Sequence, residues 1–76
     1  MVKPTSVTNS IRALRFASGE MTQAELAERV GVTRQTIIAI EQGKYSPSLE
    51  MAFQIARALR VRLDEVFHYP DAEEIR

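Results

Sequence analysis

Residues 31–44, "GVTRQTIIAIEQGK", predict a short helix with a marked beginning and end. A threonine near the start can cap a helix N-terminus, and a glycine near the end supplies the left-handed turn that commonly stops a helix. Two isoleucines stand side by side in this helix, and adjacent residues lie about 100° apart around its axis. If Ile37 faces the core, Ile40 shares its face and Ile38 points outward.

The outward face of this helix combines side chains that suit the major groove of DNA. It presents a forked cation, a two-ended amide and three methyl-bearing side chains: Arg34, Gln35, Thr36, Ile38 and Ala39. In B-DNA, arginine pairs with guanine O6 and N7, glutamine pairs with adenine N6 and N7, and methyl groups contact the thymine methyl. An ordinary solvated surface is the alternative for the polar residues, and a partner protein is the alternative contact for Ile38.

Two helices are predicted before this segment, each with its own boundary signals. The first begins near Thr8 or Ser10 and ends before Gly19. The second begins at Thr22, whose hydroxyl can accept from free backbone amides while Glu25 reaches back to complete a capping box. Only a glycine, a valine and a capping threonine separate the second helix from the third, so the two helices must cross steeply.

Two further helices are predicted after the segment, and no stretch alternates long enough to form a paired β-strand. Ser48 caps the fourth helix, whose apolar residues recur three and four positions apart, and a brief fifth helix runs through Phe67. The chain is therefore predicted to be all-α. Its expected organisation is an N-terminal extension (residues 1–8), one domain (residues 9–68) and an acidic C-terminal tail (residues 69–76).

Length and charge limit the kind of protein that this chain can be. At 76 residues it can form one small core, and ten basic residues balance ten acidic ones. Residues 1–45 hold six basic and four acidic residues, a net charge of +2, whereas residues 46–76 hold four and six, a net charge of −2. This asymmetry places the side that would face an anionic partner in the first half of the chain.

Several classes of function are disfavoured by what the sequence lacks. There is no cysteine for a disulfide or a thiolate metal site, and His68 has no second histidine with which to form a zinc site or a catalytic dyad. No apolar run is long enough for a signal peptide or a membrane span. We therefore expect a soluble cytoplasmic protein with no enzymatic activity, no metal or other cofactor, and no small-molecule ligand.

The stretch "TQAELAERVGVTRQTIIAIEQGK", residues 22–44, resembles the helix-turn-helix of the Xre-type regulators, the family of Cro and phage repressor-like DNA-binding domains. The resemblance extends to "YSPSLEMAFQIARAL" and "VRLDEVF", so it covers residues 11–67. The matches at fixed offsets include Gln23, Leu26, Ala27, Gly31, Thr33, Ile37, Ile40, Glu41, Gly43, Lys44, Pro47, Ile55, Ala56 and Leu59. The resemblance implies a compact five-helix, lambda-repressor-like fold in which the second motif helix enters the major groove while the first lies across the DNA backbone.

The resemblance also implies which residues would meet DNA. The base-reading set is Arg34, Gln35, Thr36, Ile38 and Ala39. The set that would hold the DNA backbone is Thr22, Gln23, Thr33, Lys44, Tyr45 and Ser46. Plain helix capping is an equal interpretation for Thr22 and can hold at the same time, and a solvated lysine is the alternative for Lys44. Arg15 and Glu41 match an ion pair that fixes the angle of the reading helix in phage repressor-like domains.

The sequence departs from the common family pattern at three positions. Glu20 lengthens the turn after the first helix, and Arg62 stands where many relatives place a small capping residue before the last helix. Both changes should leave the fold intact. Ile38 replaces a residue that is often polar on the reading face, so the base specificity does not follow by analogy.

A homodimer is expected because one such domain makes too few base contacts for specific recognition among competing genomic sites. Its two reading helices would sit on an inverted repeat. The predicted interface is Phe53, Phe67, His68 and Tyr69. For the two phenylalanines, completion of the monomer core is an equal interpretation.

The predicted function is that of a sequence-specific regulator of transcription that binds double-stranded DNA. Repression by occluding polymerase is the default mode of action for a domain without a sensor. The alternatives are an antitoxin-like protein that also neutralises a neighbouring gene product, and a protein–protein interaction module built on the same fold.

Overall fold

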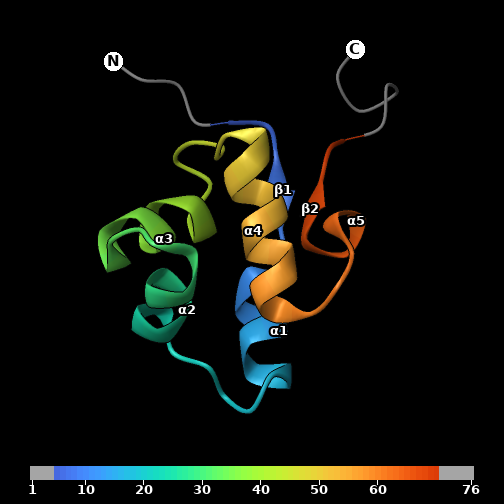
Figure 1. The fold of residues 1–76 in the computed structure, drawn as a ribbon. Helices are drawn as coiled ribbons and strands as arrows, with labels where there is room; N and C mark the ends of the chain where they lie inside the picture. The colour runs from blue at the N-terminus through green and yellow to red at the C-terminus, as the bar shows by residue number, and fades with distance from the viewer. Residues whose placement is uncertain (1–4, 71–76) are drawn as a thin grey trace.

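The computed structural model describes residues 5–70, and within them it shows five helices and two very short strands (Figure 1). The elements are β1 (Thr8–Asn9), α1 (Ile11–Ala17), α2 (Gln23–Val30), α3 (Arg34–Glu41), α4 (Leu49–Leu59), α5 (Leu63–Val66) and β2 (Phe67–His68). In Figure 1, α4 runs down the middle of the molecule, with α2 and α3 on its left and α5 and β2 on its right. The predicted five-helix fold is confirmed.

Local chemistry sets the helix boundaries as the sequence predicts. At the start of α2, the Thr22 hydroxyl accepts from the Glu25 backbone N–H at 3.0 Å, and the Glu25 carboxylate accepts from the Thr22 N–H at 2.8 Å. Thr33 and Ser48 cap α3 and α4 with their hydroxyls in the same way. Gly31 ends α2 in the left-handed conformation, with φ of +84°. These caps satisfy backbone groups that a short helix would otherwise leave unpaired.

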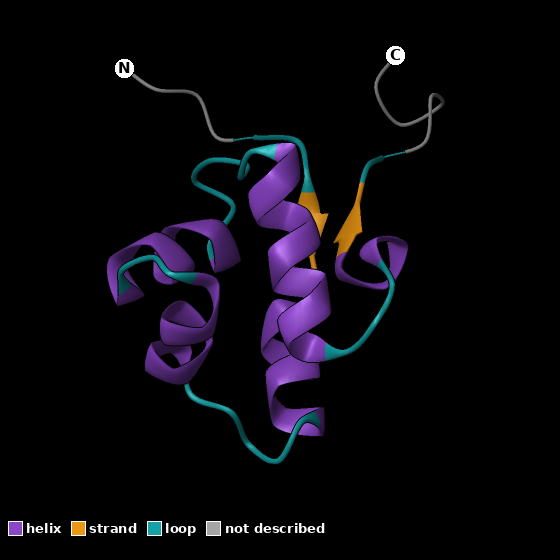
Figure 2. Cartoon of the chain, viewed as in Figure 1, coloured by secondary structure: helices purple, strands orange, loops and turns teal. Residues whose placement is uncertain are grey.

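The prediction that no segment forms a strand is wrong in one place, where β1 and β2 pair side by side (Figure 2). The pair is antiparallel, with Thr8 opposite His68 and Asn9 opposite Phe67. Strands of two residues are too short to show an alternating pattern, so only the tertiary arrangement brings them together. The pairing includes Thr8, although the sequence places this residue in the N-terminal extension, and it ties the start of α1 to the end of α5.

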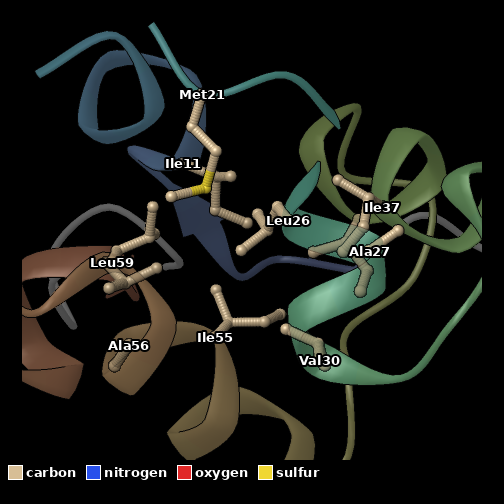
Figure 3. Close-up of a cluster of buried hydrophobic side chains, with 11 residues drawn as sticks. Ile11, Met21, Leu26, Ala27, Val30, Ile37, Ile55, Ala56 and Leu59 are labelled. Carbon is tan, nitrogen blue, oxygen red and sulfur yellow. The ribbon is translucent and has the colours of Figure 1, made fainter. Parts of the chain in front are cut away.

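The core receives at least one fully buried side chain from each helix. These side chains are Ile11, Leu26, Ile37, Ile40, Ile55 and Val66. Figure 3 shows Ile11, Leu26, Ile37 and Ile55 converging from α1, α2, α3 and α4 on the same interior. Each such burial contributes about 1.5–3 kcal/mol relative to exposure, so the short α3 is anchored by the two isoleucines that its helical spacing places inward.

Ile38, predicted to point outward, is half-buried. It belongs neither to the buried cluster nor to the partly buried side chains that pack against that cluster. Part of the Ile38 side chain still lies on the solvent-facing side of α3.

Candidate nucleic-acid interface

The first turn of α3 presents polar side chains to solvent while its inner face is anchored. Arg34 and Gln35 are exposed, and Thr36 is half-buried. The Thr33 hydroxyl accepts from the Thr36 backbone N–H at 3.2 Å and lies 3.0 Å from the Thr36 hydroxyl. This cap fixes the direction in which the helix starts, and hence the direction in which Arg34 and Gln35 project.

A nearly buried ion pair holds the other end of α3. The Arg15 guanidinium of α1 donates to both carboxylate oxygens of Glu41, at 2.7 Å and 3.2 Å, and also donates to the Met21 carbonyl at 2.8 Å. The side chains of Arg15 and Glu41 are only 8% and 9% exposed. A two-point contact between a planar guanidinium and a carboxylate restrains orientation as well as distance, so α1 fixes the angle of α3.

Gln23, expected to contact a DNA phosphate, takes part in the same network. Its side-chain amide nitrogen donates to the Glu41 carboxylate at 3.2 Å. This contact links the beginning of α2 to the end of α3. A glutamine amide carries two N–H groups, so one group can hold Glu41 while the other remains for a ligand.

Asn9 is a positioning residue that the sequence analysis overlooked. Its side-chain nitrogen donates to the Ile40 carbonyl at 2.9 Å, and its side-chain oxygen accepts from the Ile11 backbone N–H at 3.2 Å. An asparagine just ahead of a helix is a familiar capping signal. No pattern in the sequence indicates the contact with the Ile40 carbonyl, because this acceptor lies 31 residues away.

An open surface hollow of about 1030 Å³ lies where α1 meets the beginnings of α2 and α3. Among residues 5–70, its lining contains three arginines, Arg12, Arg15 and Arg34, but only one acidic residue, Glu41. Because Arg15 already pairs with Glu41, the positive charges of Arg12 and Arg34 remain uncompensated within the hollow. A negatively charged group is the complementary partner for such a surface.

Arg12 is the second residue that the sequence analysis missed. Its guanidinium carbon lies 5.6 Å from the ring centroid of Phe16, which is itself exposed. A cation over an aromatic ring gains about 0.5–1 kcal/mol at exposed sites, so the ring helps to hold the guanidinium in place. Arg12 is exposed on α1, and no pattern in the sequence indicates that this helix lies beside the start of α2.

The residues expected to hold the DNA backbone lie at the two helix starts and in the loop after α3. Thr22 is exposed. The hydrogen bond from its backbone N–H makes the larger contribution to lowering the pKa of Glu25, and its hydroxyl makes a smaller one. Lys44, Tyr45 and Ser46 are all exposed in the loop that follows α3. Their position allows contact with a ligand that runs along the end of α3.

The four residues of the expected dimer interface lie on different elements. Phe53 is 54% exposed on α4, whereas Phe67 is half-buried and packs against the core. The His68 side chain lies in β2 with its Nε2 3.2 Å from the Ser10 hydroxyl, and Tyr69 is exposed just beyond it. A second, shallow hollow lies beside Phe53 and is lined by α4 residues alone.

The described residues form neither a metal site nor a membrane span. Within residues 5–70, no group of three or more His, Asp or Glu side chains lies close enough to hold a metal ion. No helix in that range has the length and apolar character to cross a membrane. The polar surface around α3 and the adjoining hollow is therefore the feature to compare with known proteins.

Comparison with protein families matches the chain to HTH_3, described as helix-turn-helix, over residues 11–66. An uncharacterized HTH-type transcriptional regulator of Methanocaldococcus jannaschii is 55% identical over 53 residues, covering 70% of this chain and 80% of that protein. The uncharacterized HTH-type transcriptional regulator YgzD of Bacillus subtilis is 46% identical over 59 residues, covering 78% and 88%.

Solved structures show the same fold. The restriction-modification controller protein C.AhdI of Aeromonas hydrophila superposes with a TM-score of 0.67 and 33% identity, over 72% of this chain and 78% of that chain. A Bacteroides fragilis protein superposes with a TM-score of 0.73 and 27% identity, over 82% and 98%. These matches confirm the resemblance and the fold, and a family of regulators agrees with the prediction that the chain is not an enzyme. The chain belongs to the HTH_3 helix-turn-helix family, the Xre/Cro-like class of DNA-binding transcriptional regulators.

Proposed function

We propose that the protein regulates transcription by binding an inverted-repeat operator as a homodimer, with α3 of each copy in the major groove. The observation that supports this proposal is that hydrogen bonds from other elements hold α3 in place while its first turn is exposed. Arg34 and Gln35 are exposed on its first turn, while Arg15, Gln23 and Asn9 all hydrogen-bond to its last two residues. A reading helix needs such support, because base contacts depend on the angle at which it enters the groove.

Base discrimination is assigned to the exposed side of α3. Arg34 would donate to guanine O6 and N7, and Gln35 would pair with adenine N6 and N7. The methyl-bearing residues Thr36, Ile38 and Ala39, all half-buried, would form the rim that contacts thymine methyl groups. Each good paired contact is worth about 1–3 kcal/mol of discrimination against the wrong base.

Contacts with the DNA backbone are assigned to both ends of the motif. Thr22, Gln23 and Thr33 would donate to phosphates from the starts of α2 and α3, where helix dipoles favour anions. Lys44, Tyr45 and Ser46 would hold the backbone beyond the end of α3. We add Arg12 to this set, because its charge is uncompensated in the hollow beside the start of α2.

The regulator would act in the cytoplasm as a homodimer, and repression by covering a promoter is the simplest mode of action. An inverted repeat would match the two-fold symmetry of such a dimer. Phe53 is the favoured member of the expected interface set, because Phe67 is packed against the core and His68 is within hydrogen-bond distance of Ser10. An operator recovered well upstream of a promoter would contradict repression.

Arginine substitutions test the assignment on a duplex that contains the selected operator. We expect Arg34→Ala to weaken specific binding by about 1–3 kcal/mol and to relax discrimination at one position. Arg12→Ala should weaken binding to all sequences and reduce the salt dependence by about one phosphate contact. Arg29→Ala is the matched control, since Arg29 is also exposed but lies in the last turn of α2.

The same series separates the proposed function from its alternatives. If Arg34→Ala and Arg29→Ala bind every duplex alike, α3 does not read bases. If the parent protein has no affinity for DNA, and a protein partner binds both variants equally, the fold serves protein contacts instead.

A further inference from the structure

The outward face of α4 carries two large apolar side chains that the fold leaves uncovered. Leu49 is 68% exposed and Phe53 is 54% exposed, and both line the shallow hollow together with Glu50, Gln54 and Arg57. The opposite face of the same helix is buried in the core through Ala52, Ile55, Ala56 and Leu59. Leu49 and Phe53 therefore form a small apolar patch with a polar rim, a composition that is common in protein–protein contacts.

The five residues form one face rather than a scatter. At about 100° per residue, they fall within roughly 140° of arc around the α4 axis. Glu50 and Arg57 lie close to the middle of that arc and are two turns apart, roughly 10.5 Å along the axis. Within residues 5–70 the ion pairs are Arg15–Glu41 and Arg62–Asp64, so neither Glu50 nor Arg57 has a charged partner among these residues.

Glu50 lies near the start of α4 and Arg57 lies near its end, and this order of charges is complementary to a second, antiparallel copy of the same helix. Two copies of α4 that packed antiparallel about a point between Phe53 and Gln54 would place Glu50 of each copy opposite Arg57 of the other. Both ion pairs would form at once, with the two Phe53 side chains between them and Leu49 of each copy just beyond. A parallel arrangement would instead place like charges opposite each other, which is unfavourable.

We propose that α4 is the homodimer interface and that a second copy of this chain packs against it antiparallel, with reciprocal Glu50–Arg57 pairs. This inference rests on the proposed function, whose homodimer it specifies. An antiparallel helix pair has a two-fold axis perpendicular to the helices, which is the symmetry that an inverted-repeat operator requires. It places Phe53 at the centre of the interface and leaves Phe67 in the monomer core.

Charge-reversal variants of the full chain test the interface in the absence of DNA, by sedimentation over a range of concentrations. Glu50→Arg alone and Arg57→Glu alone place like charges at both contacts, so each should dimerise about tenfold or more weakly than the parent. An equimolar mixture of the two variants should restore dimers, because every contact in the mixed pair is then attractive. The double variant Glu50→Arg/Arg57→Glu should also restore them.

Two further variants control for the apolar part of the face. Phe53→Gln should weaken the dimer. Phe16→Gln is the matched control, because Phe16 is 53% exposed but lies on α1, and it should leave the dimer unchanged. Circular dichroism of each variant checks that helix content is unchanged. A defect in folding would not be repaired by mixing two defective variants, so the mixture separates pairing from folding.

The outcomes distinguish this inference from the proposed function. A parent protein that stays monomeric, single variants that dimerise as well as the parent, or a mixture that stays monomeric would each overturn the α4 interface. Sequence-selective DNA binding that persists in that case would leave base reading by α3 intact. Dimers that respond as expected, in a protein that selects no DNA sequence, would support the α4 interface and contradict the DNA function.

Discussion

At the level of single residues, Arg15 makes the most extensive set of buried polar contacts in the structure. Among residues 5–70, Arg15 is the one charged side chain that is buried. Its guanidinium makes three hydrogen bonds, two to Glu41 and one to the Met21 carbonyl. No buried side-chain nitrogen or oxygen in that range lacks a partner. Because a buried charge without its partner is costly, this site should be sensitive to the loss of either member of the pair.

Removal of the Glu41 carboxylate should be strongly destabilising. Glu41→Ala leaves Arg15 buried and unpaired, so we expect a loss of about 3–5 kcal/mol in the free energy of unfolding. Urea denaturation followed by circular dichroism measures it. The control is Arg62→Ala, which breaks an ion pair whose side chains are 81% and 69% exposed and should cost less than about 1 kcal/mol. Equal losses for both variants would show that burial does not set the strength of the Arg15–Glu41 pair.

The capping box of α2 gives a pH-dependent contribution to stability. Two hydrogen bonds lower the pKa of Glu25 below its ordinary value of 4.5. The one from the Thr22 backbone N–H is the larger cause, and the one from the Thr22 hydroxyl is the smaller. A carboxyl with a lowered folded-state pKa stabilises the fold above the ordinary pKa, and this contribution is lost as pH falls through the lowered value.

The corresponding measurement compares the parent with Glu25→Gln in urea denaturation at several pH values. The parent should be more stable at neutral pH, and its advantage should shrink as the pH falls below about 4.5. An advantage that stays constant or grows on acidification would contradict the role of the Glu25 charge.

At the scale of elements, two helices end in the same backbone conformation with different residues. Gly31 follows α2 with φ of +84°, and Arg60 follows α4 with φ of +60°. The left-handed conformation suits glycine, whereas other residues have a penalty of about 1–2 kcal/mol there. The end of α4 therefore holds strain that the end of α2 avoids.

Adding a glycine at one of these positions and removing it at the other should have opposite effects on stability. Arg60→Gly should stabilise by about 0.5–1 kcal/mol, because the relief of strain exceeds the added freedom of glycine in the unfolded chain. Gly31→Ala should destabilise by about 1 kcal/mol. A Cβ at Gly31 would meet nothing within 4 Å, so its effect would come from the backbone alone. Urea midpoints check both, and a stabilising Gly31→Ala would contradict this account.

The elements also show how far the sequence could predict the structure. The starts of α2, α3 and α4 depend on Thr22, Thr33 and Ser48, whose capping partners lie three residues away, so a local pattern suffices. The β1–β2 pair depends on residues that are far apart in the chain, and strands of two residues carry no periodicity.

The candidate site shows the same difference between features set by local sequence and features set by contacts between distant residues. The spacing of the isoleucines correctly predicted the inward face of α3, and family resemblance named Arg15 and Glu41. The roles of Asn9 and Arg12 depend on which elements lie beside α1, and this information is present only after the fold has formed.

At the scale of the whole molecule, a chain with no net charge has a positive side. The hollow beside the motif holds Arg12 and Arg34 without acidic partners, while the acidic excess lies in the second half of the chain. This distribution favours an approach to DNA through one face. In a dimer, two such faces would have to reach the same side of the duplex.

The geometry of a dimer predicts a dependence on half-site spacing. Two reading helices should bind half-sites about 10 base pairs apart, which is one turn of DNA. Insertion of about 5 base pairs places the half-sites on opposite faces of the duplex, so affinity should fall to that of an isolated half-site. Titration of both duplexes measures this fall. Unchanged affinity would mean that each domain binds alone.

The most direct test of the central claim, that α3 reads DNA sequence, is selection from a random duplex pool at near-physiological salt. Parent protein and Arg34→Ala are each incubated with the pool, and the bound DNA is sequenced over several rounds. We predict that the parent enriches an inverted repeat with half-sites about 10 base pairs apart, and that Arg34→Ala loses preference at one position in each half-site. Failure of the parent to enrich any sequence, with weak binding that disappears as salt rises, would contradict the claim.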